Sequence, residues 1–143
     1  MNWTIKTFAE LTGKEIYEIL RSRAKVFVKE QRISYVDPDG VDYKSWHVFA
    51  TENDKVCAYL RAFKDDEDTI KIGRVLTLIH GKGTGTQLMK YAISELKAKT
   101  GCKKIIMEAQ SHAISFYQRL GFTITSEEYL EEGIPHVDMK LNL

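Results

Sequence analysis

Apolar residues recur along the chain with two spacings, one typical of strands and the other of helices. Near the start, Trp3 and Ile5 alternate with polar residues, which predicts a short strand over residues 3–7. Thr12 is a residue type that often caps helices, and the apolar positions after it lie three or four residues apart. This spacing predicts a helix from Thr12 to about Glu30.

Three apolar runs follow a polar connection that contains Asp37-Pro38-Asp39-Gly40, a composition typical of turns. Short polar segments separate each run from the next, and Asn53-Asp54 is the first of these. Runs of strand length joined by such short turns predict a three-stranded antiparallel meander. Its strands are expected at residues 46–50, 56–63 and 70–76.

Helical spacing returns twice in the second half of the chain. Apolar residues from Leu88 to Leu96 share one helical face, and Gly101 ends that helix. A buried strand is expected at residues 105–107, and a second helix then runs from Ala113 to Gly121. Two further strands are expected at residues 122–125 and 136–141.

The order of these elements predicts an α/β fold of the α+β type. It consists of a mixed, mainly antiparallel central sheet of about six to seven strands, flanked by helices. The sequence contains no internal repeat, low-complexity segment or proline-rich linker at which a second domain would begin. We therefore expect one domain over residues 1–143.

Composition and charge narrow the function classes. Lys and Arg number 21 against 20 Asp and Glu, and no block of like charge stands out, so neither nucleic acid nor a membrane surface is an expected partner. The chain reaches Lys6 without an apolar leader, and no apolar stretch approaches the length of a membrane span. We expect a cytoplasmic protein, and a homodimer remains open.

The sequence indicates no metal site. Cys57 and Cys102 form no C-x-x-C motif and are expected to be small buried apolar residues, and no histidines have metal-ligand spacing. The acidic residues from Asp37 to Asp42 do not fit a calcium-binding loop, which needs a glycine at its sixth position and a glutamate at its twelfth. A turn is the better interpretation of that segment.

Glycines at positions 81, 83 and 85 lie between a predicted strand and a predicted helix. Such a loop lets the backbone approach a phosphate, whose charge is met by free N–H groups and by the positive end of the helix. A P-loop and a Rossmann fingerprint both need patterns that are absent here. An ordinary flexible turn would also fit this spacing.

The segment from Arg74 to Phe122 resembles the acyl-CoA-binding half of the Gcn5-related N-acetyltransferases. The resemblance rests on the glycine loop together with Phe116-Tyr117 and Gly121-Phe122 further along. The loop begins with His80, where that family usually has Arg or Gln. The flanks resemble the ElaA-like subgroup through the segments Arg23–Gln31 and Asp37–Gly40, His47, and the segment Gly133–His136.

This resemblance implies a single N-acetyltransferase domain that uses acetyl-CoA as cofactor and a small-molecule or peptide amine as acceptor. One strand would lie along the pantetheine arm, and the glycine loop would hold the pyrophosphate. The cofactor-binding residues implied in this way are Leu76, Thr77, Leu78, His80, Gly81, Lys82, Gly83, Thr84, Gly85 and Thr86. The acidic loop after Asp37 would border the acceptor pocket, where it could attract a cationic amine.

The resemblance also suggests catalytic residues. Tyr117 matches the family's general acid, although its helical spacing alone would fit a core aromatic equally well. Glu108, at the end of a buried strand, is our candidate for the base, and His112 is an alternative. Glu30 and His136 also remain open as bases, but we expect them in the substrate site.

Two other functions remain open from sequence. The chain could be a non-catalytic module that binds acyl-CoA as a sensor or regulator, because the motifs alone describe binding. It could also transfer a longer acyl group, since sequence does not reveal the depth of the pocket.

Overall fold

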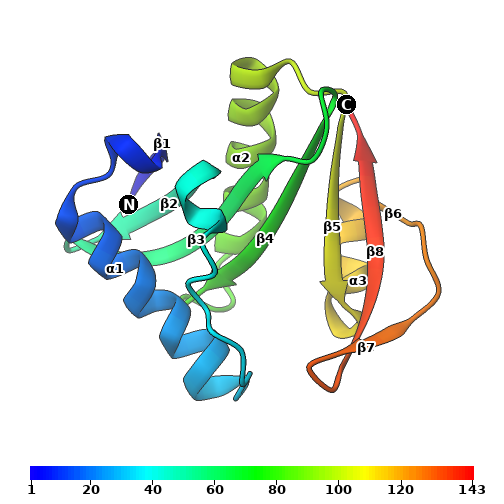
Figure 1. Ribbon diagram of the computed structural model, residues 1–143, viewed down its shortest axis with the longest axis horizontal. Helices are drawn as coiled ribbons and strands as arrows, with labels where there is room; N and C mark the ends of the chain where they lie inside the picture. Colours follow the sequence, from blue (N-terminus) through cyan, green and yellow to red (C-terminus); the bar gives the residue numbers. More distant parts are fainter.

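The computed structural model describes all residues 1–143 and contains one sheet of eight strands with helices on both faces (Figure 1). The longer helices are α1 (Gly13–Arg23) and α2 (Thr84–Thr100), and α3 (Ile114–Arg119) is short. Four further helical segments are η1 (Phe8–Glu10), η2 (Ala24–Glu30), η3 (Val41–Lys44) and η4 (Ser111–Ala113). The strands are β1 (Asn2–Thr7), β2 (Trp46–Glu52), β3 (Lys55–Lys64), β4 (Thr69–Thr77), β5 (Lys104–Gln110), β6 (Thr123–Ile124), β7 (Tyr129–Glu131) and β8 (Ile134–Asn142).

The strands lie in the order β1-β2-β3-β4-β5-β8-β6, and β7 pairs with β8. Only β4 and β5 are parallel; every other pair is antiparallel. The predicted mixed, mainly antiparallel sheet and the meander β2-β3-β4 are therefore confirmed.

The strand absent from the prediction is β7, which makes the total eight. It has three residues and joins β8 through Glu132 and Gly133, which have φ angles of 51° and 72°. Two consecutive positive φ angles are typical of the tightest hairpin turn, and Gly133 was the signal for it in the sequence.

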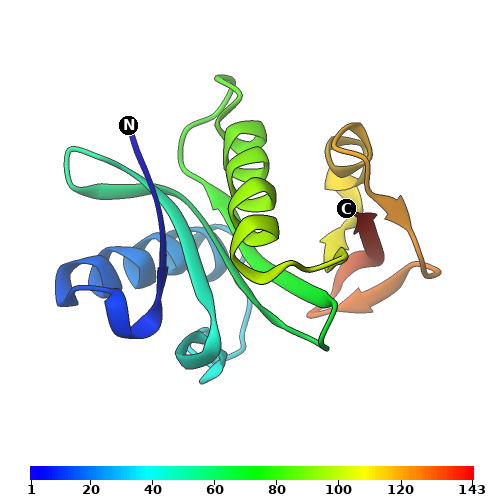
Figure 2. The same ribbon diagram turned by 90° about the horizontal axis from the view of Figure 1, so that it is seen from above.

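The helices divide the core into two parts. Figure 2 shows α1 on one face of the sheet and α2 on the other. The larger cluster packs α2 residues such as Leu88 and Met89 against β2 to β5 and β8, and the smaller one packs Ile19 of α1 against Tyr59 and Leu76. The central strand β3 is buried on both faces because it contributes to both clusters.

The first predicted helix begins and ends where expected, but its last part has a different geometry. Thr12 caps it in a reciprocal arrangement, since its hydroxyl accepts from the Glu15 N–H while the Glu15 carboxylate accepts from the Thr12 N–H. From Ala24 to Glu30 the chain widens into a π-helix, closed by the Gln31 N–H donating to the Val26 carbonyl. Such π segments are frequent at functional sites.

The parallel strands β4 and β5 pair over only four residues each. Thr69–Ile72 lies beside Lys104–Met107, and the two strands then separate, as Figure 1 shows. At the point of separation β4 has an irregular register with β3 and a positive φ of 54° at Arg74. A bulge of this kind bends its strand, so it turns β4 away from β5.

Cys57 and Cys102 are free and buried, as expected from the sequence. No helix is long and apolar enough to cross a membrane.

Candidate active site

A cleft of about 600 Å³ opens where β4 and β5 separate. One wall consists of the bulged part of β4, from Ile72 to Val75, with Arg61 and Phe63 of β3 behind it. The opposite wall comes from the end of β5, the start of the following helix and the β7–β8 hairpin. Phe27 and Gln31 close one side from the π segment η2 and the residue after it.

The edge of β4 that faces β5 has no partner strand beyond Ile72. Such an edge presents backbone N–H and C=O groups to an extended ligand, which can pair with them as another strand would. Of the predicted cofactor residues on this strand, Leu76 is buried against the α1 face and Thr77 is the last residue of β4. Leu78 follows, and its N–H donates to the Cys57 carbonyl at 2.8 Å.

The glycine loop lies at the start of α2. Gly81 and Gly83 have positive φ angles of 74° and 71°, which residues with a side chain rarely adopt. The N–H groups of Thr84, Gly85 and Thr86 donate to no acceptor within the protein. Free N–H groups at the start of a helix are of the kind that can bind an anion, so the prediction of a phosphate site at this loop stays open.

The two sequence motifs of the resemblance meet in the structure. A Cβ atom placed on Gly85 would lie 3.4 Å from the ring of Phe116, so a glycine at this position lets α2 and α3 approach closely. Phe116 in turn packs edge-on against Tyr117, with ring centroids 5.0 Å apart. The residues from Leu76 to Thr86 do not themselves line the 600 Å³ cleft, whereas Tyr117 does.

The Tyr117 side chain is 6% exposed, and its hydroxyl makes no hydrogen bond to the protein. Burial raises the pKa of this phenol well above its ordinary value of 10. The group therefore stays protonated at physiological pH and can donate a proton into the cleft.

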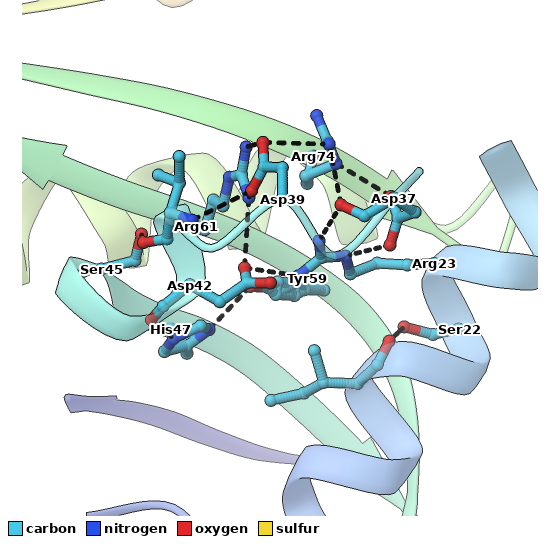
Figure 3. Close-up of polar contacts among 12 residues, drawn as sticks. Ser22, Arg23, Asp37, Asp39, Asp42, Ser45, His47, Tyr59, Arg61 and Arg74 are labelled. Carbon is cyan, nitrogen blue, oxygen red and sulfur yellow. Dashed lines mark hydrogen bonds and ion pairs between the residues drawn. The ribbon is translucent and has the colours of Figure 1, made fainter. Parts of the chain in front are cut away.

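The β3–β4 wall contains a network of three arginines and three aspartates (Figure 3). Asp37 accepts from Arg23 at 2.8 Å and from Arg74 at 2.9 Å, and Arg61 holds Asp39 through two parallel bonds of 2.7 and 2.8 Å. Asp42 completes the network with bonds of 2.7 Å from Arg23 and 3.2 Å from Arg61.

This network corrects the expectation that the acidic loop attracts a cationic amine. Asp39 does line the cleft, but the hydrogen bond from Arg61 holds its pKa well below the ordinary value. Burial would raise the pKa of Asp42, yet the bonds from Arg23 and Arg61 outweigh burial and lower it. Because three guanidinium groups balance three carboxylates, the loop presents no net charge to an acceptor.

His47 and Tyr59 lie beneath the network and support it. The Tyr59 ring packs under the Arg23 guanidinium at 5.6 Å, and its hydroxyl lies 2.7 Å from His47 Nδ1. The other ring nitrogen, Nε2, lies 2.9 Å from the Asp42 carbonyl oxygen. A carbonyl only accepts, so Nε2 donates and Nδ1 accepts from Tyr59. Both ring nitrogens of His47, a residue of the ElaA-like resemblance, are therefore occupied by hydrogen bonds that support the network.

Glu108 lies at the cleft on the opposite wall, where Lys71 Nζ contacts its carboxylate at 2.8 Å. Burial raises its pKa, but the bond from Lys71 outweighs burial, so the pKa is lowered. Glu131 of β7 lies beside Glu108, and its pKa is raised by burial and by the Glu108 charge. The sequence had not indicated Glu131, because β7 was not predicted.

The other predicted residues divide between the cleft and the surface. His136 lines the cleft and is buried, and His112 lines it from an exposed position, bonded through Nε2 to Gln110 at 2.7 Å. Glu30 is exposed at the end of η2 and is not among the lining residues, although Gln31 beside it is. Gln31 accepts from the Gln110 amide at 3.1 Å, which links η2 to β5.

A family model described as an acetyltransferase (GNAT) domain matches residues 18–143. The sequence is 35% identical to Escherichia coli ElaA over 145 residues, which cover 97% of this chain and 95% of ElaA.

Solved structures show the same similarity. The crystal structure of Escherichia coli ElaA superimposes with a TM-score of 0.92 at 34% identity and covers 99% of both chains. An acyl-CoA N-acyltransferase from Pseudomonas aeruginosa gives a TM-score of 0.92 at 36% identity over 98% of both chains. An aminoglycoside 6'-N-acetyltransferase complexed with coenzyme A shares the fold, with a TM-score of 0.76 at 14% identity, over 97% of this chain and 96% of that one.

Proposed function

Because the chain belongs to the GNAT acetyltransferase family, with ElaA among its relatives, we propose that it moves an acetyl group from acetyl-CoA to a primary amine. The amine attacks the thioester directly while both substrates are bound, so the protein supplies no nucleophile. We further propose that residues 1–143 act as one N-acetyltransferase domain.

The observation that carries this proposal is the cleft between β4 and β5, with an unpaired strand edge on one wall and the Tyr117 phenol on the other. Transfer of an acyl group needs donors near the carbonyl oxygen, where negative charge develops, and an acid near the departing thiolate. Backbone N–H groups on the β4 edge and the buried phenol are groups of these two kinds.

The residues at the start of α2 suit the pyrophosphate of coenzyme A. Their free N–H groups and the two left-handed glycines would hold it, and the exposed His80 and Lys82 beside them would meet its charge. The edge of β4 would steady the pantetheine arm. A coenzyme A complex of a protein with the same fold supports this assignment at the level of fold.

The proposed acid is Tyr117. Its hydroxyl is free of other partners and its raised pKa keeps it protonated, so it can give its proton to the sulfur as the carbon–sulfur bond breaks. Glu108 stays a candidate base, and Glu30 and His136 stay candidates for acceptor binding.

A free-thiol release assay tests the function. The protein is incubated with acetyl-CoA and a panel of polyamines, amino acids, aminosugars and peptide N-termini, and thiol release is followed together with the mass of the product. We expect thiol release with at least one amine, at a rate above that of the uncatalysed reaction. The product should be about 42 Da heavier than the amine, because an acetyl group replaces one hydrogen. Tight coenzyme A binding without thiol release from any amine would instead indicate a sensor or regulatory module.

A further inference from the structure

We propose that His136, with Glu131 beside it, is the base that takes a proton from the ammonium group of the acceptor. This inference rests on the transferase function proposed above and concerns the same cleft. It assigns the base to a pair of residues that sequence reasoning did not bring together.

The position of one proton on the His136 ring follows from its contacts. Nδ1 lies 2.7 Å from the carbonyl oxygen of Ile134. Because a carbonyl only accepts hydrogen bonds, Nδ1 carries the proton and donates it to that bond. In the neutral ring, Nε2 therefore has a free lone pair, which is what a general base needs.

The ring is held so that this lone pair stays in the cleft. The His136 side chain is 10% exposed and stacks on Tyr129, with ring planes 19° apart and centroids 6.1 Å apart. Tyr129 is itself fixed, since its hydroxyl donates to Asp138 at 2.6 Å. Nε2 makes no hydrogen bond to the protein, although His136 lines the cleft. A nine-tenths buried side chain that lines the cleft thus keeps one ring nitrogen unpaired.

The carboxylate of Glu131 lies at a distance that suits a shared ligand. Its Oε2 is 3.8 Å from His136 Nε2, which is too long for a hydrogen bond between them. One donor nitrogen placed beside both could bond each of them at an ordinary length of about 2.8 Å. An ammonium group has three N–H donors, so it can bond to the carboxylate and the imidazole together.

Glu108 is less suited to the same task. It is engaged by Lys71, which stabilises its ionised form, and a carboxylate with a lowered pKa is a weak base. Burial and the Glu108 charge instead raise the pKa of the neighbouring Glu131. Glu131 has one side open to solvent, with a side chain 50% exposed, so the pair has an exit for the proton.

The charged and titratable groups around the pair come from each neighbouring element. They are Lys71 on β4, Glu108 on β5, His112 in η4, Tyr129 and Glu131 on β7, Glu132 in the hairpin turn, and Asp138 on β8. Glu131 and Glu132 have no Lys or Arg partner, in contrast to Glu108 and the three aspartates of the arginine network. The excess charge of this wall is negative, which favours a cationic acceptor.

His136 Nε2 takes one proton from the ammonium, and the Glu131 carboxylate stabilises the imidazolium that forms. The amine nitrogen then bonds to the thioester carbonyl carbon, the carbon–sulfur bond breaks, and the sulfur takes the proton of Tyr117. After the attack, the nitrogen loses a second proton, which passes to the Tyr117 oxygen and restores its hydroxyl. The proton on His136 passes to solvent.

The test compares two acceptors that differ in their need for a base. One is the most active alkyl amine of the thiol-release panel, which is an ammonium ion at neutral pH, and the other is hydroxylamine, which is already neutral. His136→Gln should lower kcat/KM about 100-fold or more with the alkyl amine but no more than about threefold with hydroxylamine. Glu131→Gln should lower it about tenfold with the alkyl amine, again with little effect on hydroxylamine.

Leu130→Ala is the control, since it changes an exposed side chain of the same hairpin that does not line the cleft. We expect it to change kcat/KM less than about threefold with either acceptor. Equal losses with both acceptors in His136→Gln, or losses as large in Leu130→Ala, would mean a structural role and overturn the proposal. Full activity of His136→Gln with the alkyl amine would also overturn it.

A measurement that needs no turnover separates this proposal from the function itself. Long-range proton–nitrogen NMR of the imidazoles should show the neutral His136 ring protonated at Nδ1. A ring protonated at Nε2 would exclude His136 as the base even in an active enzyme. If the NMR result holds but no amine releases thiol, the transferase function fails and the base role fails with it.

Discussion

Single side chains in this protein take their chemistry from contacts made across the fold. Tyr117 and His47 are both buried, but Tyr117 lines the cleft and its hydroxyl has no hydrogen-bond partner, whereas both ring nitrogens of His47 are hydrogen-bonded. Burial therefore leaves the Tyr117 hydroxyl available for chemistry but fixes the His47 ring in place. Tyr117 is accordingly tested through catalysis and His47 through stability.

Replacing Tyr117 by Phe should lower kcat at least tenfold, because general acid catalysis is worth about 100-fold or more and water can replace part of it. Binding of acetyl-CoA should stay within about twofold, since the phenyl ring keeps the packing against Phe116 and Phe122. Steady-state kinetics and calorimetric titration measure the two quantities. An unchanged kcat, with the chemical step shown to limit the rate, would remove Tyr117 from the acid role.

Stability should depend on pH through His47. Burial lowers its pKa below the ordinary value of 6.5, so the folded state prefers the neutral ring. Its contribution to stability is complete above about pH 6.5 and is lost as the pH falls through the folded pKa. Between about pH 7 and pH 5, the free energy of unfolding in urea should fall more steeply for the wild type than for His47→Gln. Parallel slopes would contradict this assignment.

At the scale of elements, the bulge in β4 and the start of α2 prepare the two ends of the site. The bulge separates β4 from β5, and the left-handed glycines leave backbone N–H groups free at the helix start. The sequence showed the glycines but not the bulge, because Arg74, which takes the positive φ, is not a residue type that marks one. Asp37 and the ring of Tyr35 hold Arg74 in this conformation.

Gly83→Glu should weaken coenzyme A binding about 100-fold or more, because it places a carboxylate where the pyrophosphate would lie. No atom lies within 4 Å of a Cβ at this position, so the fold should survive. Gly101→Glu is a matched control: its φ of 65° is equally left-handed and its Cβ site equally open, but it lies at the other end of α2. Both variants should lose similar stability in thermal denaturation, and equal binding by both would rule out the loop as the phosphate site.

At the scale of the whole molecule, the arginine–aspartate network joins segments that are far apart in the chain. It connects α1 through Arg23, the loop from Asp37 to Asp42, β3 through Arg61 and the bulge of β4 through Arg74, as Figure 3 shows. Arg23 is fully buried at its centre. The wall of the cleft therefore depends on a cluster of charges that are paired with one another.

Arg23→Met should lower the free energy of unfolding by about 3 kcal/mol or more, because buried carboxylates lose a partner. Arg21→Met, two residues earlier on α1, removes a partly exposed ion pair with Glu18 and should cost about 1 kcal/mol or less. Urea denaturation of both variants measures the difference. A loss of the same size in both would show that the network does not hold the molecule together.

Local patterns in the sequence determined where the helices of this protein lie. Helical spacing, the Thr12 cap and the glycines at 83 and 101 placed the helices, since these signals act within a few residues. Paired motifs further along the chain identified the family. The sequence also indicated Tyr117 and His136 individually.

Only the tertiary structure decided which charges neutralise one another and which remain free. Asp37 and Asp42 looked available in sequence, yet arginines 14 to 37 positions away pair with them. Glu131 was not noticed, and the hairpin places it 3.8 Å from His136 Nε2. The physical reason is that Coulomb and hydrogen-bond energies depend on distances of a few ångströms in space, which the spacing of residues along the chain does not specify.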